Sequence, residues 1–376
     1  MKAGVLYIVG SFKSGGTETQ LLEILRRLDR SRFVPHVLCI NKEGGLLSDV
    51  EKTGVEIREM RFSRLLSPLS WGRLRSHAAW ARARGIRIIQ GFHFHGNLYG
   101  ALLKRGCPGS SLVVCEQAIY GPRAPRHRWG RAYYYRSTDV VLANCEAVRR
   151  AAAERDRLDP ARITVIYGGV DIDKYHPRSQ VKEPGGLVIG LVGRLHPDKG
   201  QMILVDAAPA ILKEIPSARI VLIGEGPQRR EIEGQIENLG LGSSIHLLGD
   251  RRDVPELLAA MDLLVLPSAS EGFANAALEG SSSGLPVVVS DAGGNPEIVE
   301  DGVTGRVFRV GDPTMLASCI LDLLRDPQVA RRAGEAGRRR VERMFPLEEM
   351  VHGHERLYED LLARKNGSAP SIREAS

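Results

Sequence analysis

The sequence predicts an α/β fold of two domains, each built on a doubly wound parallel sheet. Short apolar runs alternate with helical patterns in both halves of the chain, and a break separates the two series. The length, 376 residues, is sufficient for two domains of ordinary size. The break, Pro177 to Gly186, is rich in glycine, proline and charge, so it is the expected linker.

The apolar runs give the expected strands in order. The first series is expected near residues 3–10, 33–40, 86–90, 111–115, 138–142 and 162–166. The second is expected near residues 187–192, 219–223, 244–248, 262–266, 286–290 and 305–308. After about Asp312 the pattern is mostly helical. The resulting division is a first domain at 1–178, a second at 179–345, a last helix at 346–364 and a small, polar, disordered tail at 365–376.

Composition excludes several classes of protein. Hydrophobic residues make up 43% and charged residues 26%, which is ordinary globular usage, and no long apolar span occurs. The first apolar run, Ala3 to Val9, lacks the basic leader and cleavage site of a signal peptide, so a cytoplasmic protein is expected. The five cysteines are odd in number and form no C-x-x-C pair, so neither a disulfide framework nor a zinc site is expected.

Charge is divided unevenly along the chain. Residues 1–178 hold 30 Lys and Arg against 16 Asp and Glu, a balance of +14, whereas residues 179–376 hold 22 against 29, a balance of −7. Two basic stretches also contain aromatic residues: Arg58 to Arg87 with Trp71 and Trp80, and Arg123 to Arg136 with Trp129 and Tyr133 to Tyr135. This pattern favours peripheral contact with anionic membrane lipid or a diphosphate-linked lipid. Amphipathic surface helices with solvated arginines remain the alternative. Nucleic acid is not expected, because no recognition motif accompanies the charge.

Two glutamates in the second domain have a spacing suited to an extended ligand. Residues 271 to 279 read E-G-F-A-N-A-A-L-E and follow an apolar run that ends at Pro267. A helix beginning near Ala274 places Glu271 in the preceding loop and Glu279 in the second turn. Between them, a helix N-terminus offers its amide groups and its dipole to a phosphate. The expected amides belong to Phe273, Ala274 and Asn275.

A second loop, Gly193 to Gly200, follows the strand expected at 187–192. Its glycines, Gly193 among them, let the backbone approach a ligand, while Arg194 and Lys199 bring two cations to one place. Arginine offers a planar fork to phosphate oxygens and lysine a mobile point charge, so the pair suits a leaving diphosphate without a metal. Such residues alone are commonly solvated loop charges. Their presence together with the paired glutamates favours a functional role.

Two further glycine turns have less specific patterns. Gly15 and Gly16 precede a helical pattern, Glu18 to Leu28, which suggests contact with a donor phosphate or an acceptor. The alternative is a tight turn that needs glycine's freedom. The segment Gly224 to Arg229 has only part of a dinucleotide fingerprint, and its Gly226 is expected to line a nucleotide pocket.

Five signatures occur in one order: Gly15 to Glu18, Val165 to Asp171, Gly193 to Gly200, Glu271 to Glu279, and Gly293 to Glu297. With these, nearly the whole chain resembles the retaining glycosyltransferases of family 4. The resemblance implies the GT-B architecture, two facing Rossmann-like domains with a cleft between them and a last helix that crosses back to the first. It also implies that the first domain binds the acceptor and the second the nucleotide sugar. Arg194 and Lys199 would bind the donor diphosphate, Glu279 the ribose hydroxyls and Glu271 the sugar hydroxyls.

The resemblance implies a histidine beside the transferred sugar, for which the candidates are His93 and His95. The family has His-x-His directly at the end of the strand expected here at 86–90. In an ungapped register those places fall on Gln90 and Phe92, so a shift of two or three residues is needed. His93 is favoured over His95, and a histidine without a catalytic role stays open. Gly168 and Cys145 also depart from the family's usual asparagine and serine, which affects the hinge and cleft more than the reaction.

The expected activity is transfer of a sugar from a nucleoside diphosphate donor, UDP- or GDP-linked, to an acceptor hydroxyl with retention at the anomeric carbon. The expected setting is synthesis of envelope polysaccharide or lipid-linked glycan. No cofactor or metal is expected. Asp171-Ile-Asp173 has the D-x-D pattern that binds metal in another glycosyltransferase fold, but we interpret it as structural. The alternatives are a sugar-nucleotide epimerase on the same fold and a non-catalytic sugar-nucleotide-binding subunit.

Overall fold

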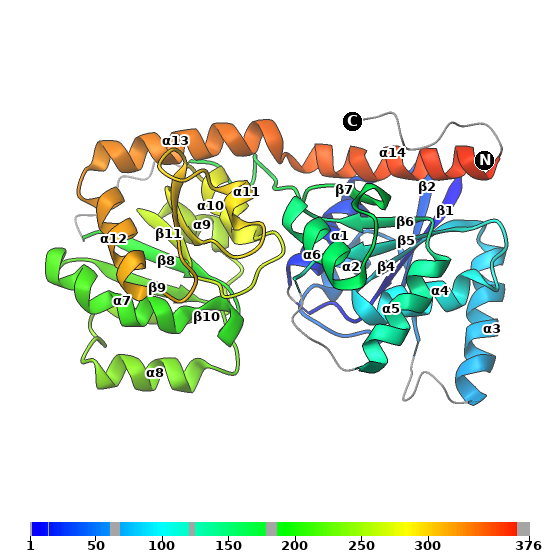
Figure 1. Cartoon of the computed structure of the whole chain (residues 1–376), viewed down its shortest axis with the longest axis horizontal. Coiled ribbons are helices and arrows are strands. Elements are labelled where there is room, and N and C mark those ends of the chain that lie inside the picture. The colour runs from blue at the N-terminus through cyan, green and yellow to red at the C-terminus, as the bar shows by residue number, and fades with distance from the viewer. Residues whose placement is uncertain (1, 14, 61–67, 120–124, 178–185, 367–376) are drawn as a thin grey trace. The chain divides into compact units, whose positions relative to one another are not determined.

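The structure, a computed structural model, describes residues 2–13, 15–60, 68–119, 125–177 and 186–366. The chain forms two compact units, each an α/β domain (Figure 1). The N-terminal unit comprises Met1–Tyr167 with Glu348–Ser376, and the C-terminal unit comprises Gly168–Leu347. Nearly all of the expected linker and of the expected disordered tail lies outside the described residues.

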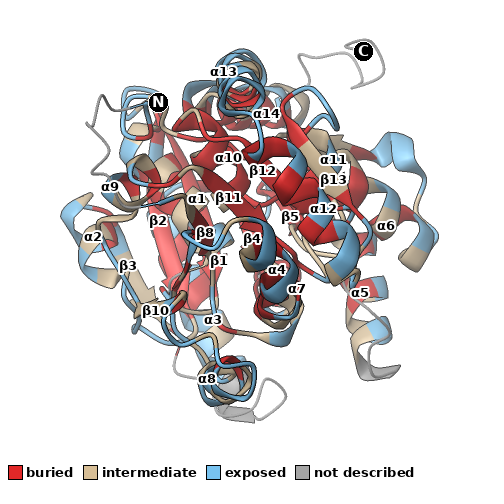
Figure 2. Cartoon of the chain, turned by 90° about the vertical axis from the view of Figure 1, so that its left-hand side faces the viewer, coloured by how far each residue is buried: buried red, intermediate tan, exposed pale blue. Residues whose placement is uncertain are grey.

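The N-terminal unit is built on a parallel sheet with strand order β3-β2-β1-β4-β5-β6-β7. The strands are β1 (Ala3–Val9), β2 (Phe33–Cys39), β3 (Glu56–Glu59), β4 (Ile86–Phe92), β5 (Ser111–Glu116), β6 (Val140–Ala143) and β7 (Ile163–Val165). The central strands are buried on both faces, which is why their sequences are continuous apolar runs rather than alternating ones (Figure 2). The order reverses between β1 and β4, which makes the carboxyl ends of these strands a topological switch point.

Helices cover both faces of this sheet. They are α1 (Gly16–Arg27), α2 (Leu47–Lys52), α3 (Pro68–Ala83), α4 (His93–Lys104), α5 (Pro125–Ser137), α6 (Glu146–Asp156) and α14 (Leu347–Lys365), with a short 3-10 turn at Pro160–Arg162. Helix α14 is distant in sequence but anchored in the core. The buried Tyr358 hydroxyl donates to Gln90 Oε1 at 2.5 Å, and the Tyr358 ring meets Phe33 edge to face at 5.6 Å.

The C-terminal unit repeats the design with strand order β10-β9-β8-β11-β12-β13. Its strands are β8 (Val188–Val192), β9 (Arg219–Ile223), β10 (Ile245–Gly249), β11 (Leu263–Leu266), β12 (Val287–Ser290) and β13 (Gly305–Phe308). Its helices are α7 (Gln201–Glu214), α8 (Arg229–Asn238), α9 (Val254–Ala259), α10 (Asn275–Ser282), α11 (Asn295–Ile298), α12 (Pro313–Leu324) and α13 (Pro327–Met344), with a 3-10 turn at Pro197–Lys199. Here the switch point lies between β8 and β11.

The expected fold class is confirmed, and two local departures matter. Strand β3 was not expected, because Glu56-Ile-Arg-Glu59 is polar and half-exposed; it forms the edge of the sheet and pairs on one side only. Strand β4 was expected to end at Gln90 but continues through Phe92, where Gly91 and Phe92 pair with Val114 and Cys115. No described helix combines the length and apolar character needed to cross a bilayer.

Candidate functional site

The site in the C-terminal unit lies at the carboxyl ends of β8 and β11, where an open α/β sheet binds its ligands. The loop after β8 is Gly193 to Gly200, and the loop after β11 begins at Pro267. The two loops are joined through their backbones, because the Ala269 N–H donates to the Asp198 carbonyl at 2.8 Å. Residues that are far apart in sequence therefore meet at one point of the fold.

Lys199 and Glu271 form the centre of this site. Lys199 Nζ lies 2.5 Å from Glu271 Oε1, and Ser268 Oγ donates to the same oxygen at 3.0 Å. The side chains are 24% and 11% exposed, so the ion pair is partly removed from water, where its attraction is stronger than at the open surface. The sequence predicted Lys199 and Glu271 as separate donor contacts and gave no signal for Ser268. The structure places all three together.

Arg194 differs from Lys199 in having an exposed side chain. That side chain makes no hydrogen bond or ion pair with the part of the chain that the structure describes. Its backbone, however, is fixed: the Arg194 carbonyl accepts from Gln201 Nε2 at 2.7 Å, and Gln201 is fully buried. The loop thus presents a guanidinium from a rigid backbone.

The glycines of this region have two different roles. A Cβ added at Gly193 would meet only the Lys199 side chain, at 4.0 Å, so the space beside Gly193 is open. At Gly200 the φ angle is 70° and a Cβ would lie 2.0 Å from the Pro267 carbonyl oxygen. At Gly226, which was expected to line a nucleotide pocket, a Cβ would lie 2.2 Å from the Leu195 oxygen. Gly200 and Gly226 are therefore required by backbone packing, whereas Gly193 leaves room for a ligand.

Helix α10 follows the Glu271 loop and begins at Asn275, which confirms the expected helix start near Ala274. Ala274 is the N-cap and provides no side-chain cap, so the amide end of α10 is not covered by its own cap residue. Phe273 is buried and its ring meets Phe345 edge to face at 5.2 Å. Glu271 lies before the helix and Glu279 within it, as the spacing predicts.

Glu279 has neighbours that the sequence did not indicate. Burial raises the pKa of its carboxyl group, while the charge of Lys174 and a hydrogen bond from Tyr175 act in the opposite direction. The Tyr175 carbonyl accepts from Arg338 Nη1 at 2.6 Å and from Ser282 Oγ at 2.5 Å. The segment that contacts Glu279 is thus held by α13 and α10.

Asp171 stabilises the same segment. Its Oδ1 accepts from the backbone N–H groups of Asp173 at 3.2 Å and Lys174 at 2.9 Å, the geometry of a capped turn. This arrangement supports the structural interpretation of the D-x-D pattern. Among the described residues, no group of three or more His, Cys, Asp and Glu side chains is arranged to hold a metal ion.

The switch point of the N-terminal unit brings Gly15, Glu18 and His93 together. Gly15 caps α1 with a φ of −161°, which is extended backbone that other residues also adopt, so no positive φ requires glycine at this position. A Cβ at Gly15 would instead lie 2.6 Å from Glu18 Oε2. Gly16 is the first residue of α1. Glu18 Oε1 lies 3.8 Å from His93 Nε2, a contact that the sequence did not indicate.

His93 begins α4 directly after β4, which ends at Phe92, two residues later than expected. His93 has a φ of 56°, an uncommon conformation for a residue other than glycine and one found more often at functional sites. His95 is exposed and meets Phe94 edge to face at 5.4 Å.

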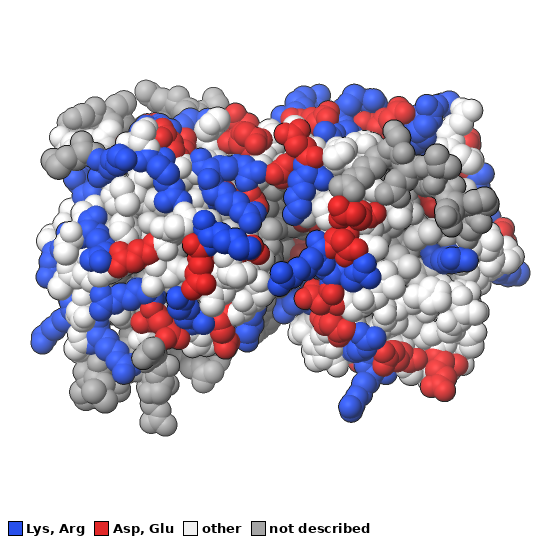
Figure 3. All heavy atoms as spheres, turned by 180° about the vertical axis from the view of Figure 1, so that it is seen from behind, with Lys and Arg blue, Asp and Glu red and all other residues white. Residues whose placement is uncertain are grey.

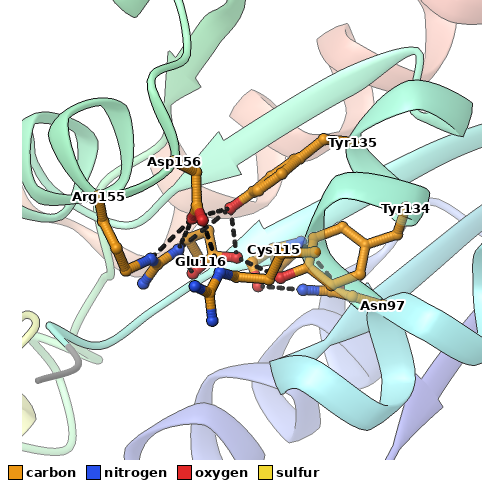
Figure 4. A network of polar contacts seen from close by, with 8 residues as sticks. Asn97, Cys115, Glu116, Tyr134, Tyr135, Arg155 and Asp156 are labelled. Atoms are coloured by element: carbon orange, nitrogen blue, oxygen red, sulfur yellow. Dashed lines mark hydrogen bonds and ion pairs between the residues drawn. The ribbon is translucent and has the colours of Figure 1, made fainter. Parts of the chain in front are cut away.

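A buried polar network lies at the end of β5 (Figure 4). Glu116, 3% exposed, accepts from the Tyr134 and Tyr135 hydroxyls at 3.2 and 2.9 Å. Arg155 donates to Glu116 at 3.1 Å and to Asp156 at 2.7 Å. Burial raises the pKa of both tyrosines well above the usual range, so both remain hydrogen-bond donors.

Part of the expected aromatic surface is buried, so that part of the prediction is wrong. Tyr134 and Tyr135 are buried, and Trp80 is only 8% exposed, with its ring against His36. Exposed indoles remain at Trp71, 52% exposed, and Trp129, 80% exposed. Arg126 and the residues 61–67 and 120–124 of the basic stretches lie outside the side chains that the structure describes.

Comparison with known proteins follows the same division of the chain. The family described as "Glycosyl transferases group 1" matches residues 172–340, and that described as "Glycosyltransferase Family 4" matches residues 14–174. An uncharacterized glycosyltransferase, MJ1178 of Methanocaldococcus jannaschii, is 30% identical over 74% of this chain and 77% of its own length.

A second relative and a solved structure are also similar. The UDP-Gal:alpha-D-GlcNAc-diphosphoundecaprenol alpha-1,3-galactosyltransferase of Escherichia coli is 30% identical over 64% of this chain, which spans 65% of that enzyme's length. The Anabaena protein Alr3699/HepE, solved with UDP and glucose, has a TM-score of 0.84 and 25% identity, covering 94% of this chain and 99% of its own.

Proposed function

The chain belongs to the group 1 glycosyl transferases of the family 4 type, and on that premise we propose that it transfers a sugar from a UDP-sugar to an acceptor hydroxyl. The observation that carries the proposal is the Lys199, Glu271 and Ser268 cluster at the switch point of the C-terminal unit. UDP is favoured over other nucleotides because the similar Anabaena protein was solved with UDP.

In this proposal the bound donor breaks the ion pair between Lys199 and Glu271, and each residue then contacts a different part of the donor. Lys199 moves from Glu271 to the diphosphate, Glu271 accepts from hydroxyls of the sugar, and the exposed Arg194 provides the second cation. Glu279 binds the ribose hydroxyls, and the hydrogen bond that it makes with Tyr175 orients its carboxyl group. The open side of Gly193 and the amide end of α10 border the same ligand.

The reaction proposed is a substitution with retention on one face of the sugar. The bond between the anomeric carbon and the diphosphate oxygen breaks, and the bond to the acceptor oxygen forms. The acceptor proton passes to the departing diphosphate, whose growing charge Lys199 and Arg194 stabilise. His93, held near Glu18, is the residue that we place beside the transferred sugar. The chain's own cations serve the diphosphate, so we propose that no metal takes part.

For the acceptor we propose a lipid-linked glycan of the cell envelope, reached from the cytoplasmic face of the membrane. The similar E. coli galactosyltransferase acts on a diphosphoundecaprenol-linked sugar. The basic balance of residues 1–178 supports contact with such an anionic lipid.

The experiment is measurement of UDP or GDP release from a panel of nucleotide sugars, with and without membrane lipid extract and with EDTA present. The proposal is supported if the nucleotide is released from one donor and if this release is lost in both Lys199→Ala and Glu271→Ala. Lys213→Ala, which removes an exposed lysine from α7, is the matched control and should turn over normally. Activity that returns only with Mg²⁺ or Mn²⁺ would contradict the metal-free mechanism.

Analysis of the products distinguishes a retaining glycosyltransferase from the alternative functions. Proton NMR of the glycoside tests retention, because the anomeric configuration of the product must equal that of the donor. An altered nucleotide sugar formed without an acceptor would mean an epimerase. UDP-sugar binding without release under any condition would mean a binding subunit.

A further inference from the structure

One of the five sequence signatures, Gly293 to Glu297, contributes no residue to the proposed donor site. It forms the turn after β12 and the first residues of α11. The surface of the C-terminal unit in Figure 3 mixes acidic and basic side chains, whereas Ser268, Ser290 and Asn295 are uncharged and at most 1% exposed. Asn295, which begins α11, is fully buried, so it influences a ligand only through other residues.

A chain of hydrogen bonds links Asn295 to the loop after β11. Asn295 Nδ2 donates to the Ser290 carbonyl at 3.2 Å and to the Ser290 hydroxyl at 3.3 Å. The Ser290 hydroxyl donates its own proton to the Ser268 carbonyl at 2.6 Å. The ladder between β11 and β12 ends at Leu266 and Val289, so these side chains continue the connection beyond the last paired residues.

The direction of these hydrogen bonds is fixed by the groups themselves. The Ser290 carbonyl only accepts, so the donor end of the Asn295 amide must face it. The Ser290 hydroxyl has one proton, which it gives to the Ser268 carbonyl while accepting from Asn295. Asn295 Oδ1 is buried and makes no hydrogen bond within the described part of the chain. The donor groups of Asn295 therefore determine its orientation.

The same turn contacts the loop a second time, through the backbone. The Gly294 N–H donates to the Gly272 carbonyl at 2.9 Å. Ser268 lies before Glu271 in the chain and Gly272 directly after it. The loop is thus held on both sides of Glu271 by residues at the start of α11 and the end of β12.

Ser268 connects this chain to the centre of the candidate site. Its hydroxyl donates to Glu271 Oε1 at 3.0 Å, and Lys199 contacts the same oxygen. Within the described part of the chain, Oε2 of Glu271 has no such contact, so this oxygen is available to hydroxyls of the donor sugar. When Lys199 moves to the diphosphate, the Ser268 hydroxyl is the contact that keeps Glu271 in place.

We infer that Asn295 and Ser290 are positioning residues for sugar transfer. They fix the backbone of Ser268, and Ser268 in turn directs Glu271 towards the donor sugar. The inference rests on the proposed function, which assigns Glu271 to the sugar. A displaced carboxylate should slow transfer, because the reaction depends on exact placement of the groups around the sugar. UDP has no sugar, so its affinity should change little.

The test compares Ser290→Ala and Asn295→Asp with the unaltered protein in steady-state transfer from the UDP-sugar. Asn295→Asp keeps the shape of the side chain but removes both donated hydrogen bonds. Each variant should lower kcat about tenfold, while UDP affinity from calorimetry is nearly unchanged. Ser290→Ala is the milder change and is decisive if Asn295→Asp lowers the melting temperature strongly.

The matched control is Ser110→Ala in the N-terminal unit. It also removes a buried serine hydroxyl that donates to a backbone carbonyl, that of Cys107 at 2.7 Å. Because this hydroxyl has no connection to the Glu271 loop, the variant should keep the normal kcat even if its melting temperature falls. A normal kcat in Ser290→Ala as well would overturn the inference.

A double variant separates positioning from a merely structural role. Ser268→Ala removes the hydroxyl that reaches Glu271, so adding Ser290→Ala should lower kcat further by less than about twofold. If Ser290 only stabilised the sheet, its replacement would lower kcat by the same factor with and without the Ser268 hydroxyl. That result would contradict the inference.

Amide hydrogen exchange without any donor keeps the inference separate from the proposed function. Ser290→Ala should speed exchange several-fold in the loop that contains Ala269, whose N–H donates to the Asp198 carbonyl, while Ser110→Ala leaves it unchanged. Unchanged exchange in Ser290→Ala would count against the inference. If this exchange is faster but the unaltered protein releases no nucleotide from any donor, the proposed function is refuted and the support of the Glu271 loop stands.

Discussion

At the scale of single residues, the pairing of Lys199 with Glu271 determines how the candidate site behaves without a ligand. The lysine that we assign to the diphosphate is neutralised by the glutamate that we assign to the sugar. UDP alone lacks the sugar, so it separates the pair without giving Glu271 a new partner. An intact UDP-sugar satisfies both residues.

Glu271→Gln should therefore have opposite effects on the two ligands. UDP should bind several-fold more tightly, because Lys199 no longer leaves an ion pair worth roughly 1 kcal/mol to reach the phosphates. Turnover of the UDP-sugar should fall by about a hundredfold or more, because a charged hydrogen bond to the sugar is lost. Calorimetry with UDP and a steady-state assay measure the two effects. Glu237→Gln, at an exposed position, is the control. Weaker binding of UDP would contradict the role assigned to the pair.

His93 combines two properties that a substitution separates. Its backbone has a positive φ, which asparagine tolerates, and its imidazole lies near Glu18. We expect His93→Asn to keep the melting temperature within a few degrees while lowering kcat by roughly a hundredfold. His93→Val should also lower the melting temperature, because a β-branched residue is strained at this φ. Near-normal turnover of His93→Asn, with His95→Asn as the comparison, would exclude a role beside the sugar.

The sequence identified these residues but not their contacts. Lys199 and Glu271 each belong to a recognisable motif, yet they are 72 residues apart, and their pairing depends on β8 lying next to β11. That neighbour relation is a property of strand order, which periodicity does not determine. Ser268 and Glu18 have no motif of their own. Each acquires its role only from the side chain that the fold places beside it.

At the scale of elements, periodicity predicted most strands to within about two residues, because buried parallel strands are continuous apolar runs. The exceptions have physical reasons. Strand β3 has one paired edge and a polar sequence, so no apolar run marks it. Strand β4 continues through Gly91, a residue that usually weakens strands, because α4 passes so close that a Cβ there would lie 2.7 Å from the Gly96 backbone.

Helix α13 is expected to influence donor binding by Glu279, because its Arg338 holds the segment that contacts Glu279. Arg338 Nη1 donates to the carbonyls of Ile172, Tyr175 and Ser282 at 2.6 to 3.0 Å, and these contacts hold the segment that bears Tyr175 against α10. Arg338→Ala should lower the free energy of unfolding by about 3 kcal/mol, since charged hydrogen bonds to three carbonyls are lost.

The same variant should raise the KM for the donor more than it lowers kcat, because Glu279 is assigned to the ribose rather than to the reacting carbon. Tyr175→Phe removes only the hydroxyl and should reproduce the KM effect without the loss of stability. Urea unfolding and steady-state kinetics measure the two effects, and Arg331→Ala, an exposed site on α13, is the control. An unchanged donor KM in both variants would refute this coupling.

At the scale of the whole molecule, the chain passes between the two units twice, once near Tyr167 and again near Leu347. The last helix, α14, therefore belongs to the core of the N-terminal unit, although the entire C-terminal unit precedes it in sequence. Leu361 is 2% exposed, and Tyr358 is fully buried against Tyr7 and Gln90. The residues assigned to the donor lie in the C-terminal unit. A change in α14 should therefore disturb the N-terminal unit without removing donor binding.

Leu361→Glu places a carboxylate in this core and should destabilise the N-terminal unit by about 4 kcal/mol. UDP affinity should remain within about threefold of normal at temperatures where the C-terminal unit is folded, while sugar transfer is lost. Differential scanning calorimetry should show an early transition that UDP does not shift, followed by one that UDP raises, because only a folded state that binds ligand is stabilised by it. Arg356→Glu, at an exposed position of α14, should behave as the unaltered protein. Loss of UDP binding together with the early transition would mean that the donor site requires both units.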